Sequence, residues 1–495
     1  MMRTWQTRLR AGIGAAATLD AYADLYGRVE RSLFADLCAG RQSINELKRE
    51  YLKRFEITAR QFNAIRIGLQ GKVSSIVERR PDLINELEQR INKATRIIAK
   101  LTHPDKIHQK NRRLANLSHR LGELKSDQEN GVVRLCFGSK RLFRAQFTLE
   151  ENGYADHAAW LEDWKDARSS EFLIVGSKDE TAGNQSCQLV VDGDAMKLRL
   201  RLPNALGKFL VLPLDLSYGR DDILEALTLN QAMTYRFVRD AKGWRVFVST
   251  NLTGRPRVSS RHAGSIALDI NSDHLAVTDL DRYGNIVGVH RIPLCTYGKT
   301  RAQAMAIIGD AVKKVVVLAR SLGKPIAIER LDFAKKKTGL EKETRRYARM
   351  LSGFAYSQIL QTLHARAFDA GIEVAAVNPA CTSIIGRHKF ARRYGISNHQ
   401  AAVAAIGRRA MDFSESPNRR MADQVAFALP VRNRAKHLWP FWRQVARKEA
   451  AHAARSRSVN RRSGSAGKPP EPGSTGDCRR NSGTRIVGNT VRLTS

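Results

Sequence analysis

The spacing of hydrophobic and polar positions changes several times along the chain. Between residues 15 and 130 apolar residues recur every three or four positions, as in Leu114, Leu117 and Leu121, with Arg113 and Arg120 between them. This period is typical of amphipathic helices, and it predicts a helical lobe with basic faces.

From residue 131 to 262 the apolar runs become short, and several of them alternate with polar residues. Alternation of this kind predicts strands that bury one face. The expected strands are residues 133–137, 171–175, 187–191, 196–202, 209–212, 234–238 and 244–248. Residues 1–14 also alternate, and they are assigned as the first strand of the same unit. So many short strands favour an antiparallel β-barrel or sandwich, which we call a β-barrel wedge.

Residues 263–445 have an α/β texture, with strands at 265–269, 274–279, 286–289, 324–329 and 372–377 and helices at 301–322, 341–370 and 399–411. After residue 446 the chain becomes rich in Ala, Arg and Ser, and then in Pro, Gly and Ser. That composition predicts a basic disordered tail over residues 446–495.

Two apolar runs of the α/β segment end in a carboxylate, one at Asp269 and the other at Glu329. A buried charge is costly unless it is paired or coordinates a metal. Acids at the ends of neighbouring strands are therefore candidate ligands of a divalent metal. This pairing predicts phosphodiester chemistry in a nuclease core of the RNase H or RuvC kind. Taken alone, Asp269 has an alternative explanation as a turn residue at the end of a strand, which its pairing with Glu329 disfavours.

The charge balance points to a polyanionic partner. The chain has 84 Lys and Arg against 48 Asp and Glu, a net charge of +36. Nucleic acid offsets the self-repulsion of such a chain, although a merely basic surface is the alternative. Strand 196–202 places Lys197, Arg199 and Arg201 on one face, as a phosphate-facing strand or a solvated outer face would.

The cysteine and hydropathy patterns argue against several other classes of protein. The six cysteines are scattered singly, without a Cys-x-x-Cys pair, so neither a zinc ribbon nor a disulfide framework is expected. No apolar run approaches the roughly 20 residues of a membrane span, and no membrane partner is expected. The first residues lack the apolar core of a signal peptide, which predicts a cytoplasmic protein.

Five segments of the α/β region carry a resemblance in their order and spacing. They are Ala267-Leu-Asp-Ile-Asn with His274-Leu-Ala-Val-Thr, the turn from Asp281 to Asn285, Ile326-Ala-Ile-Glu-Arg-Leu-Asp-Phe, Asn378-Pro-Ala-Cys-Thr-Ser, and His399-Gln-Ala-Ala with Arg408-Arg409. Residues 264–411 resemble the RuvC-like domain of TnpB-type RNA-guided nucleases of bacterial insertion sequences, relatives of the type V CRISPR effectors. The first half of the chain is similar to that family only in architecture.

The resemblance implies a multidomain α+β protein, in which a helical recognition lobe and the β-barrel wedge precede an α/β RNase H-like (RuvC) nuclease domain. It implies two partners, a guide RNA and the DNA target that this RNA selects by base pairing. It also implies that Asp269 and Glu329 are catalytic residues that bind two Mg²⁺ ions.

The chain departs from the family pattern at two places. The third acid of the family corresponds to Asn398, which offers a carbonyl oxygen but no charge and should weaken metal binding. Asp412 and Asp423 are the acids near enough in sequence to take its place. The family's zinc ribbon is replaced by the basic residues 384–394, where Arg387, Lys389, Arg392 and Arg393 either contact nucleic acid or form an ordinary basic linker.

Three functions fit these observations. The first is an RNA-guided, magnesium-dependent DNA endonuclease encoded by a mobile element. The second is an RNA-guided DNA-binding protein with weakened or lost catalysis, which Asn398 favours. The third is an unguided RNase H-fold transposase or resolvase, which the large N-terminal half disfavours. The sequence leaves open whether the protein is a monomer or a dimer.

Overall fold

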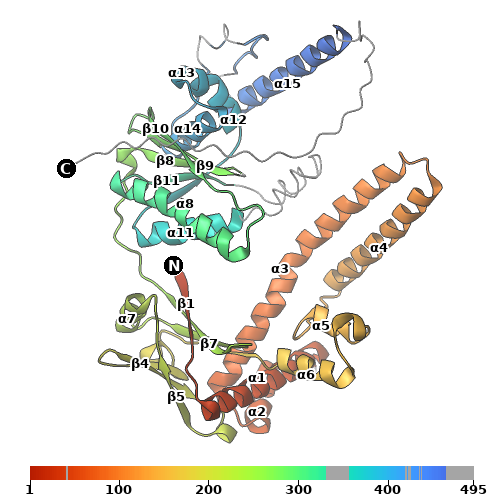
Figure 1. Cartoon of the computed structure of the whole chain (residues 1–495), viewed down its shortest axis with the longest axis vertical. Coiled ribbons are helices and arrows are strands. Elements are labelled where there is room, and N and C mark those ends of the chain that lie inside the picture. Colours follow the sequence, from red (N-terminus) through yellow and green to blue (C-terminus); the bar gives the residue numbers. More distant parts are fainter. Residues whose placement is uncertain are drawn as a thin grey trace, which may run out of the picture. The chain divides into compact units, whose positions relative to one another are not determined.

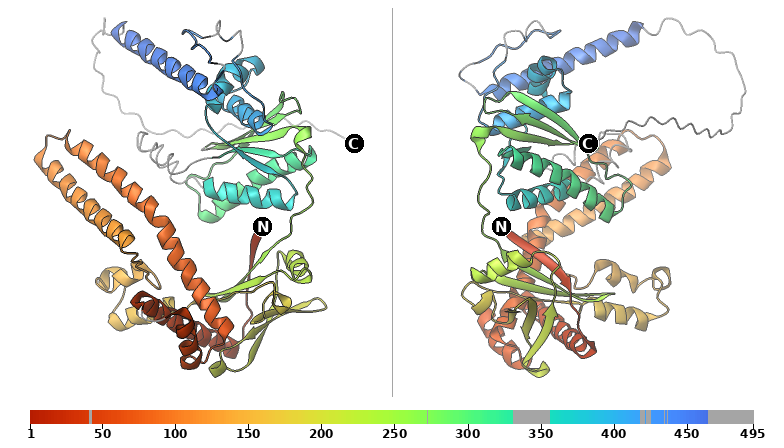
Figure 2. Two further views of the ribbon diagram at one scale, coloured as in Figure 1. Left: turned by 180° about the vertical axis from the view of Figure 1, so that it is seen from behind. Right: turned by 60° about the vertical axis from the view of Figure 1, so that its left-hand side comes forward.

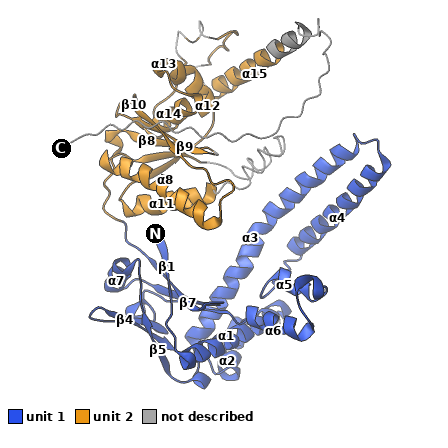
Figure 3. Ribbon diagram, in the orientation of Figure 1, with its two compact units in different colours: residues 1–254 blue, residues 255–495 orange. Residues whose placement is uncertain are grey.

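The computed structural model describes residues 1–40, 43–271, 273–330, 356–417, 421, 425–433, 435 and 437–463. The chain divides into two compact units, residues 1–254 and residues 255–495 (Figure 3). Each is described by itself below.

The first unit begins with a strand and four helices. They are β1 (Met2–Arg8), α1 (Ile13–Ala39), α2 (Ile44–Arg54), α3 (Ala59–Ile98) and α4 (Pro104–Glu129) (Figure 1). Two of the helices start at a capping box, where Ser43 pairs with Glu46 and Thr58 with Gln61. These reciprocal bonds satisfy two otherwise unpaired N–H groups at each helix start. The prediction of a helical region is confirmed.

The remainder of the first unit is mixed. It contains α5 (Lys140–Ala145), α6 (His157–Ala167), β2 (Glu171–Ile174), β3 (Cys187–Asp192), β4 (Ala195–Arg201), β5 (Phe209–Leu214), α7 (Arg220–Thr228), β6 (Met233–Asp240) and β7 (Gly243–Asn251). Six of the seven strands predicted here are confirmed. Residues 133–137 are not a strand: Leu135 and Phe137 pack against the core from an irregular connection.

These strands do not close into a barrel, so the β-barrel prediction is wrong. They form two open antiparallel sheets, ordered β1-β7-β6-β2 and β3-β4-β5. One hydrophobic core joins the inner faces of both sheets to α1 and α3, for example through Tyr22, Phe62, Phe172 and Leu198. Alternation shows only that one face of a strand is buried. A covering helix buries that face as well as barrel closure does, and the sequence pattern is the same in both cases.

The second unit contains β8 (Ser265–Ile270), β9 (His274–Leu280), β10 (Ile286–Pro293), α8 (Arg301–Ser321), β11 (Ile326–Glu329), α11 (Tyr356–Asp369), β12 (Val374–Val377), α12 (Thr382–Gly386), α13 (Arg392–Tyr394), α14 (Asn398–Ala410) and α15 (Leu438–Ser463). The predicted α/β texture is confirmed. The first half of the helix predicted at 341–370 lies outside the described residues, which contain its second half as α11.

The second unit is built on a mixed five-stranded sheet in the order β10-β9-β8-β11-β12. β8, β9 and β10 are antiparallel neighbours, whereas β8, β11 and β12 run parallel. The predicted turn from Asp281 to Asn285 joins β9 to β10, with the Asp281 carboxylate accepting bonds from the N–H groups of Tyr283 and Asn285. Gly284 has a φ of +73° in this turn, a conformation that favours glycine.

Helices cover both faces of this sheet (Figures 1 and 2). On one face α8 and α11 pack against Ile266, Leu268, Ile326 and Ile328. On the other face α14 packs against the small side chains of Ala267, Ala276 and Ala327. The sheet is therefore the middle layer of three, and its strand ends are the places where polar side chains can gather.

A smaller core lies beside α14, where α12 and α15 contribute Ile384, Ile385, Phe441, Trp442 and Val445. Helix α15 continues to Ser463, so the region predicted as a disordered tail from residue 446 begins with helix. Ala and Arg are strong helix formers, and the packed start of α15 nucleates the turns that follow. Among the described helices, none has the length and apolar character needed to cross a membrane.

Candidate active site

Asp269 and Glu329 lie side by side at the carboxyl ends of two parallel strands. Leu268 of β8 is paired with Ile328 of β11, and each carboxylate is the next residue along its own strand. Hydrogen-bonded strands are about 4.8 Å apart, so this register brings the two acids to the same level of the sheet. The structure confirms the prediction that Asp269 and Glu329 lie at the ends of neighbouring strands.

Strand alternation also fixes the face that these two residues share. Side chains two residues apart lie on one face of a strand, so Asp269 shares the face of Ala267 and Glu329 shares that of Ala327. Both alanines pack beneath α14. The two acids thus lie on the α14 face, just beyond the alanines, and both are half-buried.

Thr382 holds one of the two carboxylates. Its Oγ1 is 2.6 Å from Glu329 Oε1 and 3.1 Å from the carbonyl oxygen of Pro379. Thr382 is only 2% exposed, so water does not compete for this contact. A hydrogen bond to a charged group is worth about 1.5–3 kcal/mol, enough to fix the orientation of the carboxylate.

Tyr356, the first residue of α11, lies close to both acids. It is 6% exposed. Burial raises the pKa of Tyr356 well above its ordinary value, and the negative charges of Glu329 and Asp269 raise it further. The phenol therefore stays neutral beside the two carboxylates.

Arg409 of α14 clamps the loop that carries Thr382. Its guanidinium donates to the carbonyl oxygens of Asn378 and Ala380, the latter at 2.9 Å. Burial lowers the pKa of Arg409, while Cys381, Glu329 and Glu415 oppose that shift. The next residue of the loop, Cys381, has a φ of +65° and leads directly into Thr382. This is a strained backbone next to the candidate site.

Asn398, the candidate third ligand, is the first residue of α14 and is exposed. The first turn of this helix lies against β9, because Thr278 donates to the carbonyl oxygen of Gln400 at 3.1 Å and the rings of His274 and His399 are 6.2 Å apart. β9 is the direct neighbour of β8. The structure thus brings the start of α14 to the strand beside Asp269.

The described residues do not supply a third acid. They contain no group of three His, Cys, Asp or Glu side chains placed to hold a metal ion. Asp412 follows the far end of α14, and its neighbour Phe413 lies against Gly284 in the β9–β10 turn. That turn is at the opposite end of β9 from His274, away from Asp269. Asp423 lies outside the described residues.

The donor set nevertheless fits magnesium. Mg²⁺ prefers oxygen ligands and is commonly bound through one or two carboxylates together with substrate phosphates and water. Asp269 and Glu329 would supply the carboxylates, and Asn398 a neutral oxygen. Bound metal would lower the pKa of an attacking water and stabilise the leaving oxygen.

Other polar residues near the first strand have structural roles. Asp273 contacts His274 at 2.7 Å and Arg291 at 2.6 Å. Asp279 pairs with the buried Lys324 at 2.5 Å. These carboxylates are already engaged by cations of the same unit.

The basic segment of residues 384–394 is helical. Arg387 pairs with Glu449 of α15 at 2.5 Å, and Lys389 pairs with the buried Glu415. Of the four candidate phosphate contacts, Arg392 and Arg393 are exposed and form no ion pair with a described residue.

Arg199 and Arg201 lie on the outer face of the β3-β4-β5 sheet, next to Phe209. The Arg199 guanidinium is 3.9 Å from the centre of the Phe209 ring. Arg201 donates to the carbonyl oxygen of Lys208 and to Asn204 Oδ1, at 2.9 and 3.0 Å. The predicted basic face therefore exists, with Arg199 the more available of the two for a phosphate.

Sequence reasoning missed three residues of this site. Thr382 lies inside the segment 378–383 that carries the resemblance, so that segment is the signal that could have found it. Arg409 belongs to another such segment, yet nothing local in the sequence shows which loop it contacts. Tyr356 begins a helix far from both acids in sequence, and no local pattern marks it.

Comparisons with known proteins add three distant likenesses. No family model matches the chain, and no curated protein matches it. Among solved structures, T. thermophilus RuvC in complex with a Holliday junction substrate is 18% identical, over 30% of this chain and 90% of RuvC, with a TM-score of 0.22. A Cas12f1–sgRNA–target DNA complex is 9% identical over 82% of this chain and 99% of that chain, with a TM-score of 0.23. A CRISPR-Cas12f ternary complex is 9% identical over 82% and 98%, with a TM-score of 0.20. TM-scores this low do not establish a shared fold, and neither fold nor function is inferred from them.

Proposed function

We propose that this protein is an RNA-guided, magnesium-dependent DNA endonuclease of the TnpB type, with a RuvC-like catalytic domain. The observation that carries the proposal is the register of β8 and β11, which sets Asp269 beside Glu329 on one face of the sheet. Two adjacent carboxylates with a neutral third position suit a metal that shares its coordination with a phosphodiester.

The chain's own residues have three parts in this proposal. Asp269 and Glu329 hold the metal, Thr382 orients the Glu329 carboxylate, and Arg409 keeps the Thr382 loop in place. The order of motifs in residues 264–411 supports the guided class, and the net charge of +36 supports large nucleic-acid partners.

The test is to purify the protein from cells that carry its native locus and to sequence the RNA that copurifies. The particle is then incubated with Mg²⁺ and DNA targets that match this RNA. A discrete RNA together with cleavage of matching DNA is expected. Absence of a discrete RNA would contradict the guided function and favour an unguided RNase H-fold transposase or resolvase.

The second candidate function is an RNA-guided DNA-binding protein with weakened or lost catalysis. Asn398 favours it, because two carboxylates leave the site one charge short of the family pattern and no third acid joins them among the described residues. The same experiment separates the two: a discrete RNA with tight DNA binding and no cutting would support the binding protein.

A further inference from the structure

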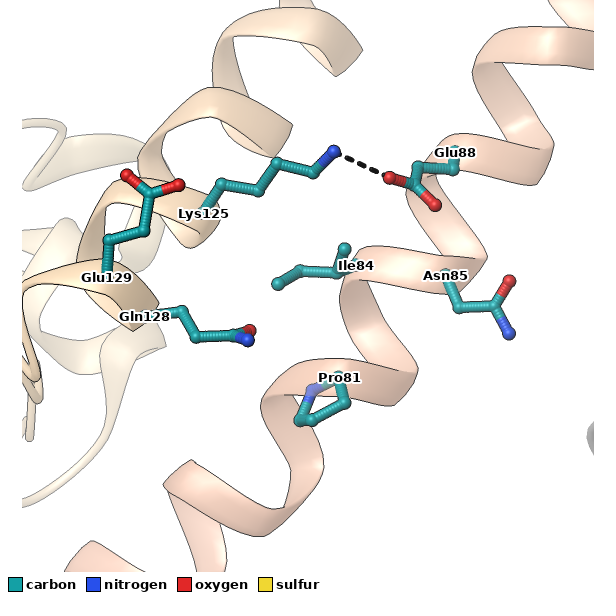
Figure 4. A pocket seen from close by; sticks show the side chains of 7 residues that line it. All are labelled: Pro81, Ile84, Asn85, Glu88, Lys125, Gln128 and Glu129. Atoms are coloured by element: carbon teal, nitrogen blue, oxygen red, sulfur yellow. Dashed lines mark ion pairs between the residues drawn. The ribbon is translucent and has the colours of Figure 1, made fainter.

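Two charged pairs of this protein differ in what they leave free. In the first unit, Lys125 and Glu88 border a cavity between α3 and α4 beside Pro81, and their side chains pair at 2.7 Å (Figure 4). Each charge neutralises the other. The pair of Asp273 with His274, between β8 and β9, is different, because one ring nitrogen of the histidine has no hydrogen-bond partner among the described residues.

Asp273 fixes the ring of His274 and the position of its proton. Asp273 Oδ1 is 2.7 Å from His274 Nδ1, and Asp273 Oδ2 accepts from Arg291 at 2.6 Å. The hydrogen bond with His274 lowers the pKa of the Asp273 carboxyl, which is therefore charged and can only accept hydrogen bonds. Nδ1 must then carry the proton, so Nε2 of the neutral ring is the bare nitrogen. A bare Nε2 is a proton acceptor.

His274 lies on the same face of the sheet as Asp269. Asp269 is paired with Ala276 across β8 and β9, and residues directly opposite each other share a face. His274 is two residues from Ala276 along β9, so it lies on that face as well. Its ring is 6.2 Å from the ring of His399 on α14, the helix that covers this face.

In this register His274 is the diagonal neighbour of Asp269. Diagonal residues of an antiparallel pair have Cα atoms about 7–8 Å apart, within reach of aromatic side chains. The side chain of His274 is 13% exposed, so it is shielded from bulk solvent yet open to a bound molecule. A water molecule bound beside the Asp269 carboxylate can therefore reach Nε2.

A second side chain beside His274 also lacks a partner. Asn271 follows β8, and its backbone N–H donates to the carbonyl oxygen of His274 at 2.9 Å. The Nδ2 atom of Asn271 is buried and has no hydrogen-bond partner among the described residues. Buried donors in proteins normally have a partner, so this one indicates a place for a bound oxygen atom, from water or from phosphate.

We propose that His274 is a further catalytic residue of the nuclease, a general base for the water that attacks the phosphodiester, and that Asp273 is its positioning residue. The inference rests on the proposed function and adds to it a proton acceptor that is not a metal ligand. An attacking water needs a group that takes its proton, and histidine is the side chain that most often has this role.

In the proposed step the water oxygen forms a bond to phosphorus while the bond from phosphorus to the leaving oxygen breaks. The electron pair of the broken bond goes to the leaving oxygen, which takes a proton from solvent. The proton of the attacking water goes to Nε2 of His274. The charge of Asp273 stabilises the imidazolium that forms, and the ring then returns its proton to solvent.

The test measures single-turnover cleavage of matching DNA by full-length chains purified with their RNA. His274→Gln is compared with a matched control, His290→Gln, which changes an exposed histidine on β10 of the same sheet. His274→Gln should lower the rate at saturating Mg²⁺ by about 10²–10⁴-fold, the usual contribution of a general base, and the control should leave it unchanged. Asp273→Asn should also lower the rate, because an amide can donate to Nδ1 and hold the wrong tautomer. Equal rates for His274→Gln and the control would overturn the proposal.

Two further measurements separate a base from the other roles of a histidine. The magnesium requirement of His274→Gln should equal that of the wild type, and a raised requirement would show that the ring acts on the metal and overturn the proposal. A DNA whose leaving oxygen is replaced by sulfur needs no proton on that atom, so loss of a general acid has no effect on its cleavage. The same loss of rate is therefore expected on this DNA, and a loss that vanished there would make His274 an acid.

Nitrogen-15 NMR of histidine-labelled protein, stripped of nucleic acid and metal, tests the pair without any cleavage. The signal that disappears in His274→Gln should show a protonated Nδ1 and a bare Nε2 in the neutral ring. A proton on Nε2 would overturn the proposal. Wild-type protein that binds a discrete RNA yet cuts no matching DNA would overturn the proposed function and the base with it. Wild-type cutting that His274→Gln leaves intact would overturn the base alone.

Discussion

At the scale of single residues, the candidate site depends on the positions of two carboxylates and on the groups that hold them. Leu268 and Ile328 are paired between two parallel strands, and Asp269 and Glu329 are the residues that follow them. Only one residue of shift along either strand would move a carboxylate to the other face of the sheet. Their chemistry therefore rests on this register, and substitutions at this scale report on it.

Replacing either acid should stop cleavage while leaving nucleic-acid affinity nearly unchanged. Asp269→Ala and Glu329→Ala each remove a metal ligand, and the lost stabilisation of several kcal/mol corresponds to a rate lower by about 10³-fold. Affinity should persist because the basic surface supplies most of it. Cleavage at the normal rate by either variant would show that the acids are wrongly assigned.

Thr382→Val should raise the magnesium concentration needed for cleavage by about 10–100-fold, because groups that orient a metal ligand affect metal affinity by that amount. Thr382→Ser keeps the hydroxyl that contacts Glu329 and should restore the wild-type requirement. A magnesium titration of the cleavage rate measures both, with unfolding temperatures as the check on folding. Identical titrations for Val and Ser would mean that the hydroxyl has no part in orienting Glu329.

Asn398→Asp should lower the magnesium requirement, because a charged ligand replaces a neutral one at the start of α14. The same titration measures it, at low magnesium where the difference is largest. Unchanged metal dependence would indicate that the third ligand is another residue.

At the scale of elements, α14 approaches the sheet of the second unit very closely. A Cβ added at Gly407 would lie 2.8 Å from Ala267 Cβ and 2.5 Å from Leu280 Cδ1. Small residues on both partners allow the helix to lie this low, next to the strands that carry the acids. The close packing of α14 against the sheet thus also sets the position of Asn398, the first residue of this helix.

Gly407→Ala should destabilise the second unit by about 1–3 kcal/mol through overpacking. Gly309→Ala is the matched control within α8, where the added Cβ would meet only the flexible end of Arg366 at 3.5 Å. That change should stabilise by about 0.4–1 kcal/mol, since alanine has fewer unfolded conformations than glycine. Calorimetric unfolding temperatures measure both, and equal shifts for the two would contradict the close packing of α14.

At the scale of the whole molecule, the positive charge that would bind nucleic acid is separable from the residues that would cleave it. The net charge of +36 belongs to the chain as a whole, whereas the candidate metal ligands are two residues of one sheet. Binding of nucleic acid and cleavage should therefore respond to different conditions.

Removal of divalent metal with EDTA should abolish the proposed cleavage and leave the affinity for nucleic acid within about threefold, because lysine and arginine contacts with phosphates need no metal. Raised salt should have the opposite effect. It should weaken the binding of nucleic acid before it lowers the rate of cleavage in complexes that have already formed. Affinity that collapsed in EDTA would show that the metal has a structural role in assembling the complex.

Most helices and strands, and the two acids, could be predicted from the amino-acid sequence. Periods of 3.6 and 2 follow from which side chains face a core, and they correctly placed the helical region of residues 15–130 and most strands. Apolar runs that end in Asp269 and Glu329 marked strand ends, because a charge is tolerated there and not within a buried strand.

Only the folded chain shows whether the strands close into a barrel. It also shows which residues that are distant in sequence come into contact. One buried face is compatible with a barrel or with a sheet under a helix, so alternation could not show that α1 and α3 cover the open sheets. Likewise Thr382, Tyr356 and Arg409 reach the acids through chain reversals that no local pattern encodes. Local spacing reports the environment of a residue, whereas its neighbours across the fold depend on how the layers pack.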